Sequence, residues 1–108
     1  MKHQEEIHVR VPQVRDPLAA IRLYYSKTEL STGDIRDLFV DNRGNRIGGD
    51  RALRLKKLAK IEADNRGIPN YDVMKCNTEV AYEVWGIKIS DLERRYAKLQ
   101  KYKEEAVS

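Results

Sequence analysis

The residues best suited to chemistry with a charged partner are cations crowded into one segment of the chain. Between positions 43 and 66, eight Lys or Arg residues stand against three acids, which gives that segment a net charge of +5. The whole chain of 108 residues carries only +4. A local basic field attracts phosphates more strongly than the same charges dispersed over a surface. The pattern therefore favours a nucleic-acid-binding segment, and a merely solvated amphipathic helix is the plainer alternative.

The residue types used in catalysis and metal binding form no recognisable constellation. Gly44 and Gly49 have the separation of a phosphate-binding P-loop, but an acid and an arginine follow where Lys and Ser or Thr are required. His3 and His8 lie far from Cys76, and no pair has the spacing of metal ligands. Cys76 and His8 could meet only if their strands paired, and no residue stands ready to orient them. We therefore expect no enzymatic activity, no metal site and no cofactor.

Length and composition indicate one small domain over residues 1–108. No apolar run approaches the roughly 20 residues needed to span a bilayer, and the polar residues 1–6 lack the apolar core of a signal peptide. The single cysteine excludes an internal disulfide and suits a reducing compartment. We expect a cytoplasmic protein of bacterial or phage type.

Apolar periodicity and capping residues predict a mainly α fold: a compact domain of four to five helices with a minor two-stranded β element. The predicted elements are, in chain order, a strand over 7–11, helices over 17–28 and 31–39, a small hairpin within 40–49, a helix over 50–66, a strand over 71–76, a short helix from 77 or 78 to 85, and a final helix over 90–104. The strand over 71–76 could pair with that over 7–11.

The helix over 50–66 combines an apolar stripe with outward cations. At about 100° per residue, an apolar sector faces the core, formed by Ala52, Leu55, Leu58, Ala59 and Ala63. Cations are predicted on the outer side: Arg54, Lys56, Lys57 and Lys60. Leu53 and Ile61 also point to that outer side, which a purely solvated helix does not require. Such residues could touch thymine methyl groups or a partner subunit, and they could equally cover a neighbouring element of the same chain.

The order of these elements resembles that of a known DNA-binding family. Ser31–Phe39 resembles the first helix of a helix-turn-helix unit, and Asp50–Leu58 is similar to its recognition helix. Residues 17–67 as a whole resemble small regulators of phages and mobile elements, including excisionase-like proteins. The resemblance implies a unit over 31–66 that binds duplex DNA sequence-specifically and regulates transcription or recombination of a phage or mobile element. The connection over 40–49 is longer than the three or four residues usual in that family.

The resemblance also implies a role for each basic position in the helix. Arg51 and Arg54 would contact base edges, because a guanidinium matches guanine O6 and N7. Lys56, Lys57 and Lys60 would neutralise phosphates and add affinity without sequence information.

Three residues before this helix would complete the interface with DNA. Arg43 and Arg46 would clamp the backbone or reach into a minor groove. Thr32, close to a helix N-terminus, would donate to a phosphate together with backbone N–H groups.

The last helix carries an apolar seam of Leu92, Tyr96, Leu99 and Tyr102. The seam could fold back on the domain or pair with its counterpart in a homodimer, in which case the DNA site would be palindromic with half-sites about 10 base pairs apart. The main alternative function is a protein-interaction adaptor, such as an antirepressor or phage assembly factor, with this seam as its interface. RNA binding ranks third.

Overall fold

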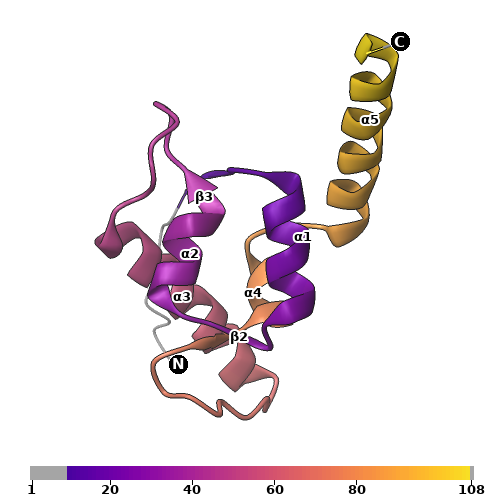
Figure 1. The fold of residues 1–108 in the computed structure, drawn as a ribbon. Coiled ribbons are helices and arrows are strands. Elements are labelled where there is room, and N and C mark those ends of the chain that lie inside the picture. Colours follow the sequence, from indigo (N-terminus) through magenta and orange to yellow (C-terminus); the bar gives the residue numbers. More distant parts are fainter. Residues whose placement is uncertain (1–9, 108) are drawn as a thin grey trace.

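Five helices make up most of residues 10–107, the part of the chain that the computed structural model describes (Figure 1). The helices are α1 (Pro17–Ser26), α2 (Thr32–Leu38), α3 (Gly49–Asn65), α4 (Thr78–Val84) and α5 (Ile89–Val107). Four two-residue strands accompany them: β1 (Gln13–Val14), β2 (Glu29–Leu30), β3 (Phe39–Val40) and β4 (Cys76–Asn77). The predicted mainly α fold with a minor β element is confirmed, although there are two small sheets instead of one.

Helices α1, α2 and α4 begin where polar side chains satisfy their first backbone N–H groups. Asp16 Oδ1 accepts from the N–H of Leu18 at 3.1 Å, with proline in the first helical position. Ser31 and Asp34 form a reciprocal capping box at the start of α2. Asn77 accepts from the N–H of Val80 at 3.0 Å and so caps α4. Helix α5 begins at Ile89, so Ser90 lies inside its first turn and is not its cap.

The strand pairing differs from the predicted one. β1 pairs with β3, and β2 pairs with β4, both antiparallel. The prediction that a strand ending at Cys76 pairs with residues 7–11 is therefore wrong. β2 and β4 each directly precede a helix that packs on α3, which brings their backbones together. Residues 7–9 of the predicted first strand lie outside the described residues, and β1 begins only after Pro12.

Helix α3 lies at the centre of the core, with α2 and α4 packed against it. Trp85, at the end of α4, donates from Nε1 to the carbonyl of Leu55 at 3.0 Å and stacks edge-on against Phe39. Tyr82 donates its hydroxyl to the carbonyl of Ala20 at 2.7 Å, which ties α4 to α1. These bonds give the buried indole and phenol their polar partners inside an otherwise apolar interior.

Helix α5 makes the molecule elongated. Its first turns pack on α1, where Tyr25 donates to Glu93 at 2.8 Å, whereas its second half projects away from the other helices (Figure 1). The molecule accordingly measures 61 Å along its longest axis and 28 and 24 Å across.

Candidate nucleic-acid interface

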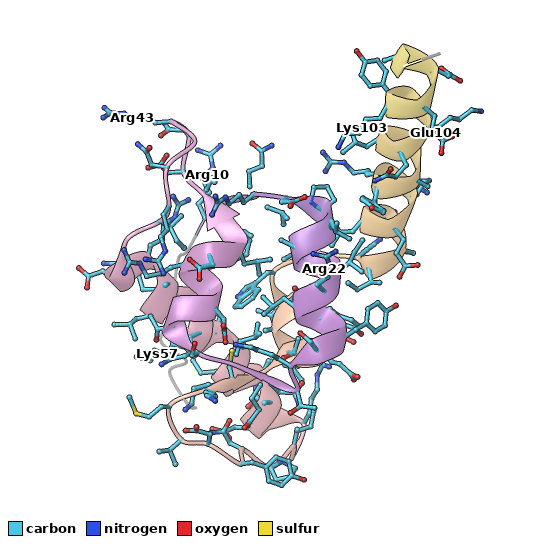
Figure 2. The ribbon with its side chains drawn as sticks, in the orientation of Figure 1. Arg10, Arg22, Arg43, Lys57, Lys103 and Glu104 are labelled. Atoms are coloured by element: carbon cyan, nitrogen blue, oxygen red, sulfur yellow. The ribbon has the colours of Figure 1, made fainter. Side chains whose placement is uncertain are left out.

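A hairpin closed by the Val40–Arg46 bridge projects from the body between α2 and α3 (Figure 1). The carboxylate of Asp41 accepts from the N–H groups of Arg43 and Asn45, both at 2.9 Å, and these bonds lower the pKa of Asp41. Gly44 adopts a φ of 81°, which favours glycine. The predicted hairpin is thus confirmed, and its turn is held in one conformation with Arg43 at the tip (Figure 2). We call it hairpin 40–46.

The connection between α2 and α3 is therefore β3 and a hairpin, not a short turn. Two side chains of α2 hold this connection in place. Arg36 donates from Nε to the carbonyl of Ile47 at 2.9 Å, and Asp37 forms an ion pair with Arg46 at 2.8 Å. The arginine predicted to clamp DNA at position 46 is thus engaged inside the chain, while its side chain remains half exposed.

Five arginines lie on hairpin 40–46, on the first turns of α3 and on the segment before β1. Arg51 donates from Nη2 to the carbonyl of Arg10 at 3.1 Å, and both residues line an open hollow of about 540 Å³ beside the hairpin. Arg54 follows Arg51 by about one helical turn and is exposed. We call Arg10, Arg43, Arg46, Arg51 and Arg54 the basic end. Sequence reasoning missed Arg10, because nothing local indicates that it lies beside Arg51, 41 positions away.

The predicted outward orientation of Lys56 is wrong. Its side chain is buried, at 8% exposure, and its ammonium group donates to Thr32 Oγ1 at 3.0 Å and to the carbonyl of Met74 at 2.9 Å. The physical reason is spacing, since Lys56 follows the buried Ala52 by four residues and so shares its face of α3. Thr32, predicted to donate to a phosphate, is an acceptor in this bond.

Lys60 also points toward the loop between α3 and β4, because its ammonium group donates to the carbonyl of Val73. Two of the three lysines predicted to contact phosphate therefore hold the loop between α3 and β4. Lys57 is the exposed one, and it lies on the face of α3 where Leu53 and Ile61 are exposed as predicted.

The seam predicted on α5 is divided by the fold. Leu92 is buried in the core, so this end of the seam packs within the chain and is not available for dimerisation. Tyr96 is half-buried and accepts a hydrogen bond from Gln100 Nε2 at 2.7 Å. Leu99 and Tyr102, on the projecting half, are 40% and 68% exposed.

Apart from the basic end, the described residues show no sign of a reactive centre. Cys76 is buried, which raises the pKa of its thiol to about 11, so the thiolate is scarce at neutral pH. Within residues 10–107, no cluster of three or more His, Cys, Asp or Glu side chains could hold a metal ion.

Comparison with known proteins adds no identification. Neither a protein-family model, nor a curated protein, nor a solved structure matches the chain. No helix in the described part of the chain is both long and apolar enough to cross a membrane.

Proposed function

We propose that the protein binds duplex DNA sequence-specifically through its basic end and so regulates transcription or recombination of a phage or mobile element. The arginines of the basic end carry this proposal: Arg43 lies on a projecting hairpin (Figure 2), Arg51 contacts the segment at Arg10, and Arg54 is exposed on α3. Three acids lie on or beside the hairpin: Asp37 pairs with Arg46, Asp41 binds backbone N–H groups, and Asp50 is in the first turn of α3.

The roles of the individual residues follow from their exposure. Arg54 is exposed and one turn into α3, where a side chain reaches base edges when a helix enters the major groove. Arg43 would contact a phosphate or a minor groove flanking that site. Lys57 would contact phosphate from the exposed face of α3, whereas Lys56 and Lys60 would contribute only through the stability of the fold. The protein would act in the cytoplasm by occupying its DNA site, without catalysing a reaction.

A homodimer through the projecting half of α5 forms part of the proposal. Leu99 and Tyr102 would pack against the same residues of a second copy. Two-fold symmetry then predicts a palindromic site, with half-sites about 10 base pairs apart.

The deciding experiment is selection from a randomised duplex pool at several salt concentrations, followed by titration of the selected duplex. Wild-type protein is expected to enrich a motif, and log affinity should fall linearly with log salt. Arg43→Ala should lower the magnitude of that slope by about 0.9, the value for one phosphate contact, and Arg54→Ala should relax the preference at one base position. Arg22→Ala, which removes an equal charge from α1 away from hairpin 40–46 (Figure 2), is the matched control and should change neither. Absence of binding at low salt would refute the proposal.

A protein-interaction adaptor remains the second candidate, because large apolar side chains are exposed on both α5 and the loop before β4. Leu99→Glu would then abolish activity in the cell while Arg54→Ala would leave it intact.

A further inference from the structure

The loop over 66–75, between α3 and β4, exposes large apolar side chains. Tyr71, Val73 and Met74 are 85%, 76% and 68% exposed, and we call these three residues the loop patch. Single apolar residues on a surface are ordinary, but several together on one short segment mark an interaction site. Neither the proposed DNA contacts nor the α5 seam accounts for them.

The backbone of the loop patch is fixed by polar groups from two other elements. From α3, the ammonium groups of Lys56 and Lys60 donate to the carbonyls of Met74 and Val73. From β2, the carboxylate of Glu29 accepts from the N–H of Tyr71 at 3.0 Å, and the Lys56 ammonium group is also bonded to Thr32 of α2. Burying an ammonium group is costly unless it is hydrogen-bonded, so these bonds hold the loop strongly.

The loop also braces itself internally. Asp72 Oδ1 accepts from the N–H of Met74 at 2.9 Å, and the Asp72 carbonyl accepts from the N–H of Lys75 at 3.0 Å. A segment that is already ordered loses little conformational entropy when it binds. The loop patch is therefore preorganised, with its backbone polar groups turned inward and its apolar side chains turned outward.

The surroundings of the loop patch are positively charged. The lysine tethers place the loop beside the middle of α3, and Glu29 lies beside Tyr71, so four cations and two acids surround the loop patch. The cations are Lys56, Lys57, Lys60 and Lys75, and the acids are Glu29 and Asp72. A second copy of the chain would present the same positive rim, so pairing of two loop patches is disfavoured by like-charge repulsion. The complementary surface is apolar at its centre and acidic at its rim.

We propose that the loop patch docks into an apolar groove, bordered by carboxylates, on a different protein. Exposed valine, methionine and tyrosine side chains gain most from an apolar pocket, whereas DNA interfaces are polar. This surface is separate from the basic end, so the inference does not rest on DNA binding. The chain would then link an acidic protein partner to the ligand bound at its basic end.

The test is a selection of displayed random 16-residue peptides on the immobilised full-length protein, with counter-selection on the Met74→Asp variant. Enriched peptides should combine large apolar residues with Asp or Glu. A synthetic peptide of the enriched sequence should bind wild-type protein by calorimetry, with affinity that falls as salt rises. Met74→Asp should weaken that binding at least tenfold. Tyr25→Asn changes a similarly exposed side chain on α1 and should leave binding unchanged.

A second variant tests whether the fixed backbone of the loop contributes to binding in addition to its side chains. Lys60→Met removes one tether without touching the loop patch, so it should weaken peptide binding and speed amide exchange over residues 73–75. Peptides that bind Met74→Asp as well as wild type, or a selection that enriches no acidic apolar peptides, would overturn the inference. A Met74→Asp variant that loses affinity for duplex DNA instead would assign the patch to the DNA interface and would equally overturn it. Retained DNA binding in that variant leaves the proposed function standing whatever the peptide result.

Discussion

Lys56 places an ammonium group where two oxygens from other elements need a donor. Its bonds to Thr32 Oγ1 and the Met74 carbonyl join α2, α3 and the loop before β4 at one point. The same side chain, viewed in the sequence alone, is one more cation in a basic segment. At the residue scale, therefore, burial and hydrogen bonding separate structural lysines from those that can meet a phosphate.

We expect Lys56→Met to destabilise the protein by about 1–3 kcal/mol, because it leaves buried oxygen atoms without a donor. Urea unfolding, followed by the emission of Trp85, the only tryptophan, measures this change. Lys57→Met is the control and should stay within about 0.5 kcal/mol of wild type, as exposed substitutions usually do. If Lys56→Met instead left stability unchanged and lowered the salt slope of DNA binding, Lys56 would be a phosphate contact after all.

Asp34 predicts a specific dependence of stability on pH. Burial opposes its ionisation, but hydrogen bonds from Lys27 Nζ at 2.7 Å and the Ser31 N–H at 2.9 Å lower the pKa of its carboxyl group. A pKa lowered by folding stabilises the protein above the unfolded value of about 3.9 and loses that effect as pH falls through the folded pKa. Asp34→Ala should therefore cost about 1–2 kcal/mol at pH 7.

That cost should shrink as pH falls below about 4 and then through the lowered pKa of the folded wild-type carboxyl group, which becomes protonated there. Urea unfolding at pH 7 and pH 2 checks the sign. Asp37→Ala, which removes an exposed carboxylate from the same helix, should cost under about 1 kcal/mol at either pH. A loss of stability in Asp34→Ala that is larger at pH 2 than at pH 7 would contradict this account.

At the element scale, hairpin 40–46 presents Arg43 through bonds made by Asp41. Removing an acid from a DNA-binding surface raises affinity if electrostatics alone matters. Asp41→Ala, however, should lower affinity for the selected duplex severalfold, because the turn loses the acceptor of two backbone N–H groups. Titration of the selected duplex shows whether its affinity rises or falls. Asp50→Ala is the control, because it removes a nearby acid without affecting the hairpin. An increase in affinity for both variants would show that the order of the hairpin is irrelevant.

Helix α5 should behave as two halves. Its first turns pack on α1 through Leu92 and Tyr25, whereas Leu99 and Tyr102 are exposed. In dilute monomer, amides beyond residue 97 should exchange much faster than those over 92–96, because short exposed helices are marginal in water. Protection of 99–106 that rises with protein concentration, and is lost in Leu99→Glu, would support the dimer. Protection that is independent of concentration would contradict it.

At the scale of the whole molecule, the basic end and the loop patch are held by one helix. Hairpin 40–46 precedes α3, and the loop patch is tethered to the middle of α3 through Lys56 and Lys60. The fold therefore displays two surfaces of different chemistry on a single rigid support.

These surfaces should act independently. Arg54→Ala should weaken DNA binding and leave peptide binding unchanged, and Met74→Asp should do the reverse. In the double variant the two losses should add to within about 0.5 kcal/mol, as expected for sites with no shared partners. Calorimetry with the selected duplex and the selected peptide, each in the presence of the other, provides the measurement. Mutual exclusion of duplex and peptide would mean that the two ligands share one surface.

Local chemistry determined much of the fold. The starts of α1, α2 and α4 follow from Asp16-Pro17, Ser31 with Asp34, and Asn77, because a cap and the N–H groups it satisfies lie within three residues of each other. Leu53 and Ile61 were placed outward by helical periodicity alone. The hairpin followed from its turn-forming residues.

Tertiary structure decided the rest of the fold and most of the candidate interface. Pairing of β2 with β4, burial of Lys56 and the approach of Arg51 to Arg10 each join residues between 18 and 48 positions apart. No periodicity within one segment records which distant oxygen a lysine will meet. The basic segment determines how many cations this part of the chain contains. The packing of α2, α4 and the loop around α3 determines which of them reach solvent, because buried oxygen atoms require hydrogen-bond donors and some of the lysines supply them.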